Sequence, residues 1–423
     1  MKHRFAITLF VLFPLTVFGQ SFNGRFSTSF YSWERNLTDA LSQNHLRLYQ
    51  TAQVTFGQLA NNRLSFHFYG QASQDISESA DADPVPRLYS AYLQWVERKG
   101  VLRRLKLGRQ RVYSGVAYGT IDGVDLSLRL AKRWKVGGFV GLLVPFSNEV
   151  EVASWDDSHA FGARVGSDDL LGARVLVSFV QRNRRPSSYA VPGRFTQKRL
   201  RFESLEQRLV GVDVLRRFAG KLGVYGRLDY DIEQERVRRG QVELTVSPSS
   251  RLDLSAEFFH RAPLVEANSI FSVFDQSTTQ DVSLRAIYRV GRDWSVNGSF
   301  GFIKYDGDES VRFGVGVRGK YGYLGYNFRR GYGGQNNGVT ASVNYPLGAK
   351  LGLIASTGLA RYRLFDETMP DNTSLTGSVG FNYRPSKYFS VDFLGQGVRN
   401  RFYDDDFRLF VKANYWTFGR FGK

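Results

Sequence analysis

The sequence contains no cysteine among its 423 residues. This absence suits export through an oxidising compartment, where unpaired thiols are a liability. Beyond the first 20 residues, no stretch approaches 18 consecutive apolar residues, so no helical membrane anchor is expected. The chain also lacks any linker, low-complexity tract or shift in composition that would divide it into the two or three soluble domains usual for its length. These absences predict one exported domain.

What is present begins with an export signal. A basic start precedes the apolar residues 5–18, which form a run too short for a membrane span. Val17 and Gly19 are small enough for positions −3 and −1 of a signal-peptidase site. Residues 1–19 are therefore predicted to be a signal peptide, and residues 20–423 a single exported domain.

An alternating strand of roughly ten residues followed by a turn repeats from Phe22 to Phe418, which is typical of an outer-membrane β-barrel. Short turns alternate with longer connections, such as residues 146–159 and 183–206. In a bacterial barrel the short turns are periplasmic and the longer loops external. The pattern predicts an all-β, antiparallel up-and-down transmembrane barrel of about 22 strands, with any even count from 16 upward acceptable. Because the first strand closely follows the predicted cleavage site, no plug domain is expected.

The expected strands have two different faces. In residues 311–317, valine or phenylalanine alternates with arginine or glycine. A soluble β-sandwich would also alternate, but it would carry fewer aromatic residues near its strand ends. Trp95, Trp134 and Trp294 lie near expected strand ends, where membrane barrels carry aromatic girdles. The bacterial outer membrane is therefore the predicted location, and outer-membrane lipid and lipopolysaccharide are predicted partners.

The last expected strand, residues 407–418, resembles the aromatic-ended closing strand of outer-membrane barrels. This resemblance implies recognition by the barrel-assembly machinery. The sequence departs from the pattern because it continues to Lys423, so either Phe418 or Phe421 could take the terminal role.

The stretch from Leu105 to Leu130 has alternating ends and a polar middle with glycines at 115, 119 and 123. It is too polar for a core and too rich in glycine for a helix, which favours strand, inward loop, strand. An ordinary surface loop between two strands is the alternative.

Its LGRQ and DGV segments resemble porins of the alginate-export and phosphate-selective type, in which an early loop folds inward and an arginine-rich lumen passes anions. The resemblance implies that this loop lines the pore constriction. The predicted constriction residues are Arg109, Arg111, Tyr113, Tyr118 and Asp122.

Charge favours an anion path independently. Lysine and arginine number 57 against 39 acidic residues, a formal charge of +18. A basic side chain facing lipid near the bilayer midplane costs roughly 2–4 kcal/mol, so these residues belong in the lumen, loops or turns. The predicted lumen-lining basic residues are Arg104, Lys106, Arg129, Arg174, Arg285 and Arg312. Pairing with acids across strands is an equally good interpretation for any one of them.

The sequence therefore predicts a porin-like channel for passive diffusion of small solutes, with anions preferred. The alternative is a barrel without transport that acts as a surface adhesin or structural protein. No catalytic set is found: His67 is expected to face the lumen near Thr55 with no acid at hand, so an enzyme is not expected.

No cofactor or metal is expected, because the acidic run at residues 404–406 reads as solvated loop charge rather than a calcium site. The basic loop at residues 183–206 either collects anionic solutes, binds lipopolysaccharide phosphates or is simply solvated. Nucleic acid is not an expected partner of an exported barrel.

Overall fold

A computed structural model describes residues 21–36, 42–77, 83–185, 189–192, 197–200, 204–266, 277–331, 333–364 and 369–420. The predicted signal peptide and Phe421 lie outside the described residues, and so do Arg194 and Arg201 of the basic loop. Among the described residues, no helix is long and apolar enough to cross a membrane.

The described chain consists of 24 strands and one short helix, α1. In chain order they are β1 (Ser21–Asn36), β2 (Ser42–Gln58), α1 (Leu59–Asn62), β3 (Leu64–Asp75), β4 (Val85–Val96), β5 (Leu102–Ser114), β6 (Ala117–Arg129), β7 (Trp134–Leu143), β8 (Ser158–Leu170), β9 (Ala173–Arg184), β10 (Tyr189–Pro192), β11 (Gln197–Leu200), β12 (Leu205–Phe218), β13 (Leu222–Asp231), β14 (Arg236–Ser249), β15 (Leu252–Arg261), β16 (Thr279–Arg289), β17 (Ser295–Tyr305), β18 (Asp308–Arg318), β19 (Gly322–Gly331), β20 (Gln335–Pro346), β21 (Leu351–Arg363), β22 (Asn372–Ser386), β23 (Phe389–Arg399) and β24 (Asp405–Gly419).

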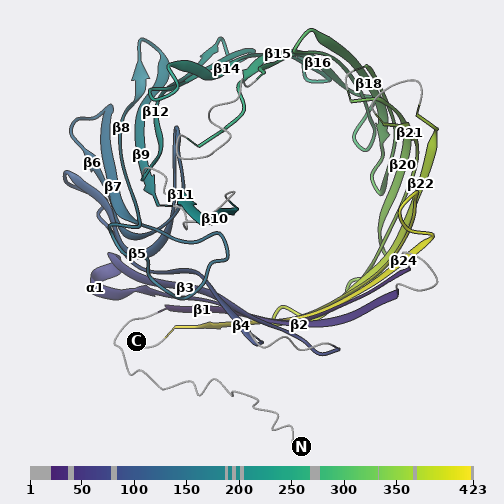
Figure 1. Cartoon of the computed structure of the whole chain (residues 1–423), viewed down its shortest axis with the longest axis horizontal. Helices are drawn as coiled ribbons and strands as arrows, with labels where there is room; N and C mark the ends of the chain where they lie inside the picture. Colours follow the sequence, from purple (N-terminus) through teal and green to yellow (C-terminus); the bar gives the residue numbers. More distant parts are fainter. Residues whose placement is uncertain are drawn as a thin grey trace, which may run out of the picture.

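Twenty-two of these strands form one closed antiparallel sheet, and β10 and β11 pair only with each other. The ring closes between the first and last strands, from Phe22 opposite Gly419 to Asn36 opposite Asp405. Figure 1 looks into this ring, and in that view β10 and β11 lie inside it. Closure leaves no unpaired strand edge, which a sheet exposed to lipid requires. The prediction of a 22-stranded up-and-down barrel is confirmed.

The two rims of the barrel carry different connections. On the rim that holds both barrel ends, the connections range from two residues, Leu171 and Gly172, to the five residues 59–63. The opposite rim includes the longest ones, such as residues 144–157 and 185–204. We call these the short-turn rim and the long-loop rim. The turn between β8 and β9 consists of Leu171 and Gly172, which adopt the positive φ values, 55° and 77°, that a two-residue hairpin favours.

The outer wall of the barrel is apolar. On β18 the outward residues Val311, Phe313, Val315 and Val317 are exposed, and the same holds for alternate positions around the ring. Lipid is the environment in which so much exposed apolar surface is stable. The alternation that the sequence shows therefore corresponds to a lipid-facing outer surface and a polar inner one.

Candidate functional site

The hairpin of β5 and β6 leaves the barrel wall and folds into the interior. β4 pairs with β5 only as far as Ala91 opposite Arg109, and β6 pairs with β7 only from Ile121 onward. Beyond these points the two strands of the hairpin pair with each other, from Gln110 opposite Ile121 to Ser114 opposite Ala117, around a two-residue turn at Gly115 and Val116. The prediction of a loop is therefore wrong, because β-pairing continues to the tip. The segment nevertheless turns inward, as expected.

A row of glycines makes the bend possible. Gly108 on β5 lies opposite Gly123 on β6, which lies opposite Gly141 on β7. Gly108 has a φ of +119°, a conformation that side chains disfavour. A Cβ on Gly123 would lie 2.1 Å from the Val140 carbonyl oxygen. Only hydrogen at these positions lets the three backbones approach closely enough for the hairpin to turn inward.

The hairpin tip docks on the inner face of the wall through polar contacts. The backbone N–H of Val116 donates to Ser178 Oγ on β9, at 3.0 Å. Arg227 Nη2 on β13 donates to the carbonyl oxygen of Gly115, at 3.1 Å, and is itself held by Asp229 at 2.9 Å. The tip is therefore fixed to two wall strands that lie far from it in the sequence.

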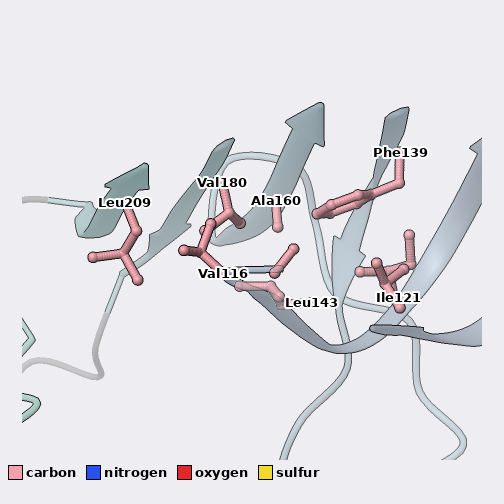
Figure 2. Packing of buried hydrophobic residues seen from close by; sticks show 9 residues of the cluster. Val116, Ile121, Phe139, Leu143, Ala160, Val180 and Leu209 are labelled. Carbon is pink, nitrogen blue, oxygen red and sulfur yellow. The ribbon is translucent and has the colours of Figure 1, made fainter. Parts of the chain in front are cut away.

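An apolar cluster lies beneath the hairpin, between it and the wall (Figure 2). Its members come from the hairpin and from four wall strands: Val112, Val116, Ala117, Ile121, Phe139, Leu143, Ala160, Val180 and Leu209. Val180 has 0% of its surface exposed. These wall residues face inward, where water would otherwise meet them, so burial by the hairpin stabilises its inward position.

Arg109 is the main polar anchor of the inward segments. Its guanidinium makes a two-pronged ion pair with Asp122, with Nε–Oδ1 and Nη2–Oδ2 both 2.8 Å. It also donates to three carbonyl oxygens, those of Leu88 on β4 and of Glu149 and Glu151 in the segment between β7 and β8. Arg109 is only 3% exposed. It therefore joins the hairpin, the wall and the 144–157 segment, and its charge is balanced locally.

The other three predicted constriction residues lie nearer the hairpin tip, on the face turned away from the apolar cluster. Arg111, Tyr113 and Tyr118 are exposed, while Val112 between them is buried. Tyr113 and Tyr118 are direct cross-strand partners, and the guanidinium of Arg182 lies 4.4 Å from the Tyr118 ring centroid. Of the two arginines predicted at the constriction, Arg109 is buried and Arg111 is accessible to solutes. Their role as a constriction remains a prediction.

The predicted lumen-lining basic residues all lie on inward positions but differ in their partners. Arg104 shares Asp125 with Arg164, at 2.8 and 2.7 Å. Arg312 pairs with Asp281 at 2.7 Å, and Lys106 lies 4.7 Å from the Tyr92 ring centroid. Within the described part of the chain, four of them make no ion pair: Lys106, Arg129, Arg174 and Arg285. The inner surface therefore combines cross-strand pairs with a positive surplus.

The interior is filled on one side and open on the other. Along β5–β9 and β12 the inward face carries the hairpin and the apolar cluster. On β18, by contrast, the inward side chain of Arg312 is 44% exposed and outward Phe313 is 45% exposed. The wall there is a single layer with free surface on both sides. Figure 1 shows the same asymmetry, with the inward segments gathered beside β5–β12.

His67, which the sequence places in the lumen, is held by its neighbours on the wall. His67 lies opposite Thr55, as expected, with Thr55 Oγ1 at 3.3 Å and Ser65 Oγ at 2.9 Å from its ring nitrogens. Its ring stacks on Tyr92. No group of three or more potential metal ligands occurs among the residues described. His67 is therefore a hydrogen-bonded wall residue.

No protein-family model matches the chain, and no curated protein matches it significantly. The siderophore receptor PirA from Acinetobacter baumannii is similar over 93% of this chain and 80% of its own, with TM-score 0.58 and 9% identity. OccAB4 from the same species matches 96% of this chain and 100% of its own, with TM-score 0.45 and 10% identity. OpdQ from Pseudomonas aeruginosa matches 94% and 98%, with TM-score 0.45 and 9% identity. At this identity the likeness to PirA concerns the fold alone.

The closed barrel and its apolar outer wall define the class of protein. Among β-sheets, only a closed one satisfies every backbone group within lipid, and barrels with an apolar outer wall occupy the bacterial outer membrane. The chain is a bacterial outer-membrane β-barrel protein.

Proposed function

We propose that the protein is a channel for the passive diffusion of small solutes across the outer membrane, and that it prefers anions. The exposed inner surface of the wall carries this proposal. Inward Arg285 and Arg312 on β16 and β18 are accessible, although the hairpin fills the opposite side of the ring. An accessible inner surface with basic side chains suits an aqueous path for anions.

The positive surplus supports the preference for anions. Where a guanidinium is paired, as in Arg312 with Asp281, its field is largely cancelled. Arg285 and Arg111 are exposed and make no ion pair among the described residues. Such charges raise the local concentration of counter-ions, and thereby the anion flux, most strongly at low salt.

The expected result is an ion current in planar bilayers whose reversal potential in a KCl gradient shows preference for chloride. Replacing Arg111 and Arg285 together with serine should lower the anion-to-cation permeability ratio, because two unpaired interior charges are removed. The matched control replaces Lys132 and Arg292 together, two exposed residues in turns on the short-turn rim that make no ion pair among the described residues. Bulk salt screens these two charges, so selectivity should change much less.

Two results would contradict the proposal. Well-folded protein that carries no current would favour a barrel without transport, acting as an adhesin or structural protein. Current without anion preference, or equal effects of the interior and the rim substitutions, would leave a channel but remove the selectivity.

A further inference from the structure

A basic recess lies beneath the hairpin tip, on the filled side of the barrel. It is a hollow of about 300 Å³ with four basic side chains in its lining, Arg104, Lys135, Arg164 and Arg174. Ser114, the residue before the tip, contributes to the same lining. The recess is therefore enclosed partly by wall strands and partly by the inward hairpin.

The charges in the recess do not cancel. Asp125 accepts hydrogen bonds from both Arg104 and Arg164, so one carboxylate serves two guanidinium groups. Lys135 pairs with Asp168. Arg174 is exposed and makes no ion pair within the described part of the chain. Four positive groups thus face two negative ones, and about two positive charges remain without a counter-charge.

The backbone brings these groups together. Arg164 on β8 lies opposite Gly137 on β7. A Cβ at Gly137 would lie 2.7 Å from Arg164 Nε, so the absence of a side chain lets Arg164 cross β7 to reach Asp125 on β6. The Nε of Arg104 is buried and has no hydrogen-bond partner among the residues that the structure describes.

We propose that the recess binds one small, doubly charged oxyanion of the phosphate or sulfate type, which holds the hairpin tip against the wall. A divalent anion matches the charge surplus, and guanidinium groups bind oxyanions through paired, charge-assisted hydrogen bonds. Hydroxyl groups of Ser114, Ser127 and Ser167 in the lining donate to further oxygens. A hollow of this size holds such an ion together with hydration water.

This site goes beyond the proposed channel. Solutes that pass beside β16–β18 do not need to enter the recess, so its ligand acts on the hairpin rather than as cargo. Because Ser114 belongs to the hairpin and Arg174 to the wall, an anion that contacts both stabilises the docked tip, and this stabilisation grows with the logarithm of the anion concentration above its Kd.

The test is calorimetric titration of sulfate into the purified full-length protein in detergent, at constant ionic strength. One saturable site per chain is expected. Arg174→Gln and Lys135→Gln should each weaken binding at least tenfold, and both side chains are exposed enough for the variants to fold. Arg285→Gln removes the same charge away from the recess and should leave the affinity unchanged.

Thermal unfolding gives a second readout. Sulfate stabilises proteins generally because it is excluded from their surfaces, so the shift in midpoint relative to chloride is compared between variants. The shift should be larger in the wild type and in Arg285→Gln than in Arg174→Gln. Phosphate and the dicarboxylate malonate serve as further probes: weaker binding of malonate supports the tetrahedral class, and equal or tighter binding overturns it.

The proposal is wrong if the wild type shows no saturable binding, or if neither Arg174→Gln nor Lys135→Gln weakens it relative to Arg285→Gln. Either result leaves the proposed channel untouched, because binding is measured without any current. Conversely, a barrel that binds sulfate but carries no current would retain this site and lose the channel.

Discussion

Replacing Arg109 with glutamine should lower the stability of the barrel by about 3–5 kcal/mol, the usual cost of breaking a buried ion pair from one side. The substitution leaves the carboxylate of Asp122, whose side chain is 15% exposed, without its partner. It also removes the donor to the carbonyl oxygens of Glu149 and Glu151, so the 144–157 segment loses two of its hydrogen bonds to the hairpin. The thermal unfolding midpoint should fall, and the open-channel current should become larger and noisier.

Arg111→Gln is the matched control, because it removes the same charge two residues away. Arg111 lies on the same face of β5 as Arg109, but it is exposed and makes no ion pair among the described residues, so the stability of this variant should stay within about 0.5 kcal/mol of the wild type. The double variant Arg109→Met/Asp122→Leu separates the two effects. It removes the unpaired carboxylate and should recover part of the midpoint, but it cannot restore the bonds to the 144–157 segment. Equal midpoints for Arg109→Gln and Arg111→Gln would show that Arg109 is not the anchor.

The strand count could be predicted because it follows from local patterns. Period-two alternation and turn residues are set by neighbours in the chain, and a closed barrel adds one constraint, an even number of strands. The exact position of each turn follows less directly from the sequence. Leu171, for example, adopts a left-handed backbone conformation that leucine rarely takes, so its residue type does not indicate a turn. For the β5–β6 hairpin, the sequence predicts the inward course but not the strand pairing that continues to the tip. Glycines at 115, 119 and 123 suggested a loop, whereas tertiary contacts keep the two strands paired to the tip.

The environment of Arg109 could not be predicted, because two of its carbonyl partners lie 40 and 42 residues further along the chain. Nothing in the sequence near Arg109 distinguishes a buried anchor from a lumen-lining charge. One signal was available: with a turn at Gly115 and Val116, Arg109 falls directly opposite Asp122, so the two are cross-strand partners. A second signal was the pair of apolar residues Phe139 and Leu209 on the otherwise polar inner face of the wall. Apolar side chains at such positions indicate that another segment packs over them.

The second large effect is expected at the bend. Gly123→Ala should sharply reduce the yield of folded barrel, because the new Cβ would lie 2.1 Å from the Val140 carbonyl oxygen and 2.5 Å from Gly141 Cα. Both atoms belong to the backbone of β7, so no side-chain rotation relieves the clash. β6 would have to separate from β7, or the hairpin would have to abandon its inward course. The yield is measured as the fraction of protein whose gel migration is heat-modifiable.

Two further glycines turn this into a graded comparison. Gly141→Ala should be impaired to a lesser degree, since its Cβ would lie 2.7 Å from the Asp122 carbonyl oxygen. Gly298→Ala on β17 meets nothing within 4 Å and should fold as well as the wild type or slightly better, because glycine within a strand costs conformational entropy. If the inward course depends on close approach at the bend, yield should fall in the order Gly298, Gly141, Gly123. A Gly123→Ala barrel that folds like Gly298→Ala would mean that β6 and β7 can part at this point without loss, and the hairpin would then owe its position to the cluster and Arg109 alone.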